Sequence, residues 1–352
     1  MSFEGSSGAK RSSKESSSEE ENVRRDVSRR TFLNAAGALG AAATVTGIVG
    51  GPTLLDAAEG MLDEKGLIAR SDELALNIQE SYGISVHFDD TLWKDVSSTK
   101  DTWLAERVQA LEQVDAELAT YPKVLFDIGP RSVTLRNALY LNGQKDTLDM
   151  SIEGVTGQRG AGSKEDIIVD VGGKLADQFH TFGWDTAETV RETFTHEFFH
   201  SIDRFDNDAW VAMFGQGGGP SLLNHDNAVP GYAIGYGMTN AMEDKATVYQ
   251  KLASGDPDFI ERCKTDQVLA AKVTTLQEYM TMVSDGLIDR EYWMVKNKSA
   301  FRDHASEYFK QQAQRVLGEP VEAFHARHPR LVHAVQNETY QGWQERLRKE
   351  YA

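Results

Sequence analysis

The chain has 352 residues, 40% of them hydrophobic and 9% aromatic, which is enough apolar surface for one large or two modest folded domains. Its net charge of −17 repels phosphate backbones and anionic lipids, so nucleic acid is disfavoured as a partner. The single cysteine excludes both an internal disulfide framework and a cysteine-based structural zinc site.

The first 58 residues are unlike the rest of the chain. Residues 1–27 are mainly Ser, Glu, Lys and Arg, with too little apolar surface to offset the entropy of ordering, so we expect a disordered polar N-terminus. In residues 28–58, the pair Arg29-Arg30 is followed by Phe32-Leu33 and a weakly apolar Ala/Gly run. A transmembrane helix is an alternative interpretation of this run, but about 18 apolar positions are near the lower limit for a span.

Residues 28–58 resemble a twin-arginine export signal. The resemblance implies that the protein crosses the membrane already folded. It would then be extracellular, periplasmic or at the cell surface. Membrane contact is expected only through this segment, if it remains uncleaved.

From residue 60 the composition becomes globular, and we predict one domain over residues 60–352. Its first part, 60–205, combines short β-rich runs with helices, and its second part, 206–352, is mostly helical. A helix is expected over residues 102–119, and strands over 84–88, 124–126, 138–141 and 166–170. Strands followed by helices indicate an α+β fold with a small mixed or antiparallel sheet.

A second amphipathic helix is expected after Asp185, which with Glu188 forms a capping-box-like start. An apolar side chain then recurs every fourth residue, which predicts a stripe facing the core. The stripe consists of Val190, Phe194, Phe198 and Ile202.

His196 and His200 lie four residues apart on this helix, so both imidazoles can point at one cation. Glu197 follows the first histidine and can reach a water bound to that cation. Two histidines and a glutamate at this spacing are the zincin arrangement of metal ligands and general base. We therefore expect one catalytic Zn²⁺. The alternative is that the two histidines bind no metal.

A catalytic zinc usually takes a third protein ligand and leaves one position open. Asp206 stands six residues after His200, where metzincins carry their third ligand, but the glycine that turns the chain in those enzymes is replaced by Asp203. The further candidates after His200 are Asp203, Asp208, Asp226, Glu243 and Asp244, with His225 as the alternative histidine. Glu243 lies on an expected helix over residues 239–252 with Thr239 or Asn240 as its cap.

The segment from Tyr236 to Ala246 reads Tyr-Gly-Met-Thr-Asn-Ala-Met-Glu-Asp-Lys-Ala. It resembles the catalytic domain of anthrax lethal factor and related secreted peptidases. The resemblance implies that Glu243 is the third ligand and that Tyr236 stabilises the oxyanion. This chain departs from the family pattern at Phe199, where the family tends to have Gly, and at Thr247, where it tends to have Glu.

Together these features predict an exported zinc-dependent endopeptidase with a zincin-like fold and a peptide or protein substrate. Asp203 is either an acid that orients a ligand histidine or a surface residue of the helix. Two alternatives stay open: a catalytically idle zincin-fold binding protein at the cell surface, and a zincin of another clan that uses Asp206.

Overall fold

The computed structural model describes residues 63–89, 100–136, 140–141, 144–145, 154–157, 166–170, 186–218, 227–298 and 300–351. The expected disordered segment 1–27 and the export signal 28–58 lie outside these residues. Among the helices that are described, none has the length and apolar character needed to cross a bilayer.

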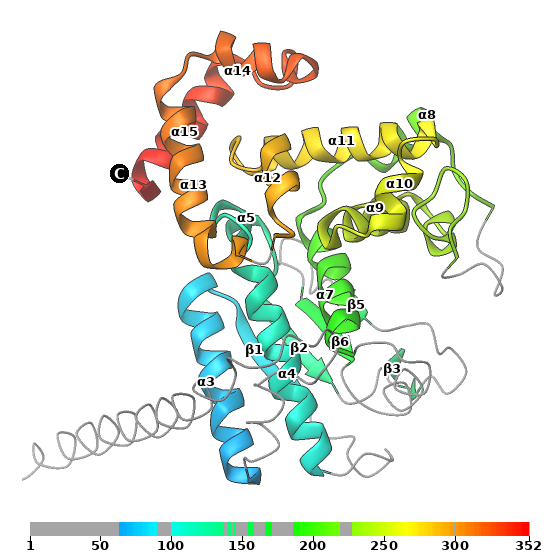
Figure 1. Cartoon of the computed structure of the whole chain (residues 1–352), viewed down its shortest axis with the longest axis vertical. Helices are drawn as coiled ribbons and strands as arrows, with labels where there is room; N and C mark the ends of the chain where they lie inside the picture. The colour runs from blue at the N-terminus through cyan, green and yellow to red at the C-terminus, as the bar shows by residue number, and fades with distance from the viewer. Residues whose placement is uncertain are drawn as a thin grey trace, which may run out of the picture. The chain divides into compact units, whose positions relative to one another are not determined.

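The strands and helices of the described residues are shown in Figure 1. The strands are β1 (Ser85–Asp89), β2 (Ser132–Arg136), β3 (Tyr140–Leu141), β4 (Gln144–Lys145), β5 (Gly154–Gly157) and β6 (Asp166–Asp170). The helices before residue 205 are α3 (Glu64–Tyr82), α4 (Lys100–Leu118), α5 (Val124–Ile128) and α7 (Thr186–Ile202). Those after it are α8 (Asn207–Phe214), η3 (Gly235–Met238), α9 (Ala241–Ser254), α10 (Pro257–Arg262), α11 (Gln267–Val283), α12 (Arg290–Val295), α13 (Phe301–Gly318), α14 (Val321–Arg327), η4 (Pro329–Leu331) and α15 (Asn337–Tyr351).

The main sheet has four strands in the order β1-β2-β6-β5. Strands β1, β2 and β6 are parallel, and β5 pairs antiparallel with β6, while β3 and β4 form a separate antiparallel pair. The α+β class is therefore confirmed, but the main sheet is mixed and mostly parallel rather than antiparallel. The reason is the crossover through α4 and α5 between β1 and β2, because a helical crossover returns the chain in the same direction.

Two of the expected strands coincide with β1 and β6, whereas the run at residues 124–126 forms the short helix α5. A three-residue apolar run has too few positions to separate a strand period from a helical one. The chain then passes Gly129-Pro130 and only afterwards enters β2, which the sequence pattern did not predict.

Helix α7 packs against the sheet and also against α4 and α9. Its predicted apolar stripe is buried, with Phe194, Phe198 and Ile202 fully inaccessible to solvent. On that side Phe198 stacks on Tyr121, with 4.8 Å between ring centroids, and meets Phe126 edge-on. Helix α7 also contacts α4, β5 and β6. The expected helix over 102–119 is observed as α4, and its apolar positions are buried as well: Leu104, Val108, Leu111, Val114 and Leu118.

Phe199, which departs from the resembled family, has a packing role. Its side chain is fully buried and stacks on Tyr249 of α9 at a centroid distance of 4.6 Å, with Tyr279 of α11 against its edge. Successive helix residues are turned by about 100°, so Phe198 and Phe199 fill different interfaces. Phe199 thereby joins α7 to α9.

A buried ion pair connects α4 to the segment that follows α12. Lys296 Nζ lies 2.7 Å from Glu117 Oε1, and both side chains are almost completely buried. The same carboxylate oxygen accepts a hydrogen bond from the Tyr121 hydroxyl, and Lys296 also donates to the carbonyl of Ala253. Each charge therefore has polar partners that compensate for lost hydration.

Replacing Lys296 by Met is expected to lower the free energy of unfolding by about 3–5 kcal/mol, because Glu117 then remains buried without its cation. Urea unfolding followed by circular dichroism measures the change. Adding Glu117→Gln in the same chain should restore part of the loss. A Lys296→Met protein as stable as the wild type would contradict this account of the pair.

Candidate metal centre

The two histidines of the site come from α7 and the glutamate from α9. His196 and His200 are one turn apart, and their rings meet almost perpendicularly with 4.7 Å between centroids. His196 is buried, and the side chain of His200 is 11% exposed. Asp185, the expected N-cap of α7, lies outside the described residues.

Glu243 stands in the first turn of α9, and the start of that helix is fixed by a cap. Asn240, one of the two expected caps, accepts hydrogen bonds from the N–H groups of Met242 and Glu243 through its side-chain oxygen. Thr239, the other, donates its hydroxyl to the carbonyl of Tyr236 instead. The first turn also carries the positive end of the helix dipole, which favours a carboxylate there.

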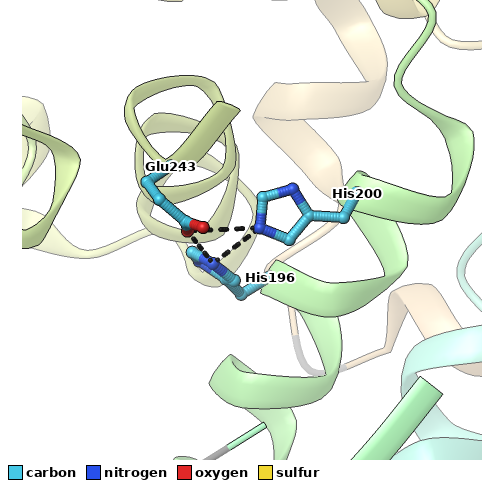
Figure 2. Close-up of side chains that lie close together, drawn as sticks. All are labelled: His196, His200 and Glu243. Carbon is cyan, nitrogen blue, oxygen red and sulfur yellow. Dashed lines mark hydrogen bonds and ion pairs between the residues drawn. The ribbon is translucent and has the colours of Figure 1, made fainter. Parts of the chain in front are cut away.

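The three side chains converge on one point, as Figure 2 shows. Glu243 Oε2 lies 3.0 Å from His196 Nε2 and 3.2 Å from His200 Nε2, and the two nitrogens are 3.1 Å apart. Tetrahedral zinc with ligands at about 2.0–2.1 Å would separate its donor atoms by about 3.3 Å. The triangle of donor atoms therefore has close to the size that such a cation requires.

The chemistry of the three donor atoms also fits a cation. Hydrogen bonds alone satisfy the triangle poorly, because one N–H cannot point well at two partners and the two nitrogens also face each other. A cation between them would attract all three lone pairs at once. Two imidazoles and one carboxylate are a donor set typical of zinc, although imidazole also suits other transition metals.

Charge favours the ionised form of Glu243. Burial by itself would raise its pKa, but the hydrogen bonds and charges of His196 and His200 hold that pKa well below its usual range. Conversely, burial would lower the pKa of His200, while Glu243, with smaller effects of Glu197 and Asp203, raises it. Glu243 is thus held in its ionised form, the form in which a carboxylate binds a metal.

Gln250 is a further site residue, and the sequence interpretation missed it. Its side-chain oxygen lies 3.3 Å from His196 Nδ1, and its amide nitrogen donates to Glu192, which also binds Lys251. A contact at Nδ1 selects the tautomer that leaves the Nε2 lone pair free for a metal. The available signal was spacing, because Gln250 follows Glu243 by seven residues and therefore shares its helix face.

The two aspartates that follow His200 have other partners. Asp203 forms an ion pair with the fully buried Lys245 of α9 and accepts a hydrogen bond from the N–H of Phe205. Its side chain is only 8% exposed, so it is not a surface acid. Asp206 caps α8 by accepting from the N–H groups of Asp208 and Ala209. Within the described residues, the group that can hold a metal contains Glu243 and not Asp206.

The two expected catalytic residues, Glu197 and Tyr236, lie next to the two histidines. Glu197 is buried beside His196, and its charge helps to raise the pKa of His200. Tyr236, in η3, is half-buried, and its ring centroid lies 6.0 Å from that of His196. The structure therefore brings together all five residues selected from the sequence.

Comparisons with known proteins give few matches. No protein-family model matches the chain, and no curated protein matches its sequence. A crystal structure of a candidate zinc-binding metallo-peptidase from Bacteroides caccae matches with a TM-score of 0.44 and 16% identity, covering 70% of this chain and 96% of that one. At this level of similarity neither fold family nor function is transferred from one protein to the other.

Substituting Gln250 by Ala is expected to weaken zinc affinity by roughly 10–100-fold, the usual effect of removing a hydrogen-bond partner of a ligand histidine. Competition with a chromophoric chelator measures the affinity. The control is Gln311→Ala on α13, where the exposed amide donates a hydrogen bond to Glu307. Equal zinc affinities in the two variants would exclude a role for Gln250.

Proposed function

We propose that the protein is a zinc-dependent endopeptidase, in which His196, His200 and Glu243 hold the metal. The observation that carries the proposal is the triangle of donor atoms at 3.0–3.2 Å, built from two histidines one turn apart and a glutamate from a second helix. A bound Zn²⁺ would lower the pKa of its water ligand toward 7 and polarise a carbonyl.

Glu197 acts as the general base in this proposal. It adjoins the first ligand and is buried, so its carboxylate acts in a region of low dielectric. It accepts the proton of the attacking water and then delivers that proton to the leaving amine. Tyr236, beside His196, donates a hydrogen bond to the oxygen of the peptide carbonyl as negative charge develops on it.

The substrate and the location are also proposals. A general base next to a three-ligand site supports hydrolysis, and the resemblance of residues 236–246 to the lethal-factor family supports a peptide or protein substrate. We further propose export by the twin-arginine route, on the pattern of residues 28–58. Membrane contact would arise only through this segment.

The general-base role is tested by Glu197→Gln, a nearly isosteric change that removes only the basic oxygen. We expect stoichiometric zinc and a loss of casein cleavage of at least about 100-fold, since general base catalysis contributes 10²–10⁴. The surface variant Glu291→Gln is the control. Unchanged proteolysis in Glu197→Gln would remove this residue from the mechanism, and a wild type without chelator-sensitive cleavage would favour an idle binding protein.

The third ligand is tested by comparing Glu243→Ala with Asp206→Ala. Glu243→Ala should lose bound zinc, because it removes one of three donor atoms. Asp206→Ala should keep it, because its carboxylate caps α8. Metal analysis by inductively coupled plasma mass spectrometry after gel filtration distinguishes them. The reverse result would transfer the ligand role to Asp206.

A further inference from the structure

The segment that precedes Tyr236 is held by charged side chains. Residues 229–233 form a tight turn, closed by a bridge between Val229 and Tyr232, with Gly231 at a φ of 77°. Three charged residues between positions 262 and 272 bind main-chain groups of this turn. They are Arg262 at the end of α10, Asp266 at the cap of α11, and Lys272 within α11.

Arg262 makes the most contacts. One terminal nitrogen of its guanidinium donates to the carbonyl of Ala233 at 2.7 Å, and the other donates to the carbonyls of Val229 and Tyr232 at 2.8 and 2.6 Å. Three carbonyls on one planar cation fix the relative positions of three peptide groups. A lysine ammonium is a compact donor and lacks this fork.

Gly231 is bound from both sides. Its N–H donates to Asp266 at 2.6 Å, and its carbonyl accepts from Lys272 at 2.7 Å. Lys272 is fully buried, lies over the ring of Tyr232 and pairs with Asp244, the neighbour of Glu243. The turn is therefore attached to α9 as well as to α10 and α11.

The held turn continues directly into η3, which carries Tyr236. Gly235 is buried and its N–H donates to the carbonyl of Asn227. Gly237 lies so close to α9 that a Cβ there would be 2.8 Å from Thr247 Oγ1. Tyr236 thus lies between a turn fixed by Arg262 and a glycine seated on α9, and its ring is left beside His196.

We propose that Arg262 is a positioning residue for Tyr236, which it places next to the metal centre through the carbonyls of residues 229, 232 and 233. The catalytic consequence rests on the proposed peptidase function. Of the three charged residues, Arg262 is the one to test, because it makes three of the hydrogen bonds to the turn, whereas Asp266 and Lys272 make one each.

The first test is kinetic. Arg262→Lys is expected to lower kcat by about tenfold with little change in KM and with zinc content unchanged, because a displaced oxyanion donor weakens transition-state binding only. In a Tyr236→Phe background the same change should have less than about a twofold effect. An equal loss in both backgrounds, or no loss with Tyr236 present, would overturn the proposal.

The matched control is Arg346→Lys, which also removes a forked arginine contact, here between the exposed Arg346 of α15 and the buried Asp285. We expect its kcat to equal that of the wild type. Arg262→Gln, which retains side-chain N–H donors, is the second variant should Arg262→Lys fold poorly, and the same loss of kcat is expected for it.

The second test does not need activity. In metal-free protein, hydrogen exchange of the amides of residues 231–238 should become at least about tenfold faster in Arg262→Lys, while the amides of α4 and α7 keep wild-type rates. Unchanged exchange at 231–238 would overturn the proposal. If the wild type cleaves no peptide, the proposed function fails, whereas the exchange result still decides whether Arg262 holds the segment.

Discussion

The packing of α7 against α9 is the constraint on which the site depends. The histidines and Glu243 are more than forty residues apart in sequence, so only this interface sets the distances between their donor atoms. The Phe199–Tyr249 stack fills its middle, and ion pairs join the helices on either side of the ligands. These pairs are Asp203 with Lys245 and Glu192 with Lys251. A shift of either helix would disturb the stack and the charge pairs together with the ligands.

Helix α9, which carries Glu243, takes part in two buried ion pairs. Lys245 and Lys272 are both fully buried, and each has an aspartate partner, Asp203 or Asp244. Buried ion pairs contribute little net stability, because desolvation cancels most of their attraction. They are directional, however, and mispairing leaves an unpaired charge in a region of low dielectric. We interpret these pairs as setting the orientation of α9 and of the turn before Tyr236, a task that nonspecific apolar contacts perform less well.

The sequence predicted best what depends on local spacing. The stripe and histidines of α7, the Asn240 cap and the position of Glu243 all follow from helical periodicity or a short motif, and the structure has them where expected. Strand order and direction depend on how distant segments pair, so β2 and the parallel pairing escaped prediction. The role of Phe199 depends on its contact with Tyr249, which lies fifty residues later and cannot be predicted from local spacing. Arg262 lies twenty-six residues after Tyr236, and no sequence motif connects it to the site.

The close approach of Gly237 to Thr247 limits which side chains fit at position 247. Because a Cβ at 237 would already meet Thr247 Oγ1 at 2.8 Å, the space between η3 and α9 has no room for a long side chain at position 247. A glutamate at position 247 would need η3 to lie further from α9. In this chain the side chain of Gln250 contacts His196 and donates a hydrogen bond to Glu192 on α7. Positions 192, 237, 247 and 250 should therefore change together in evolution, as one correlated set on α7, η3 and α9.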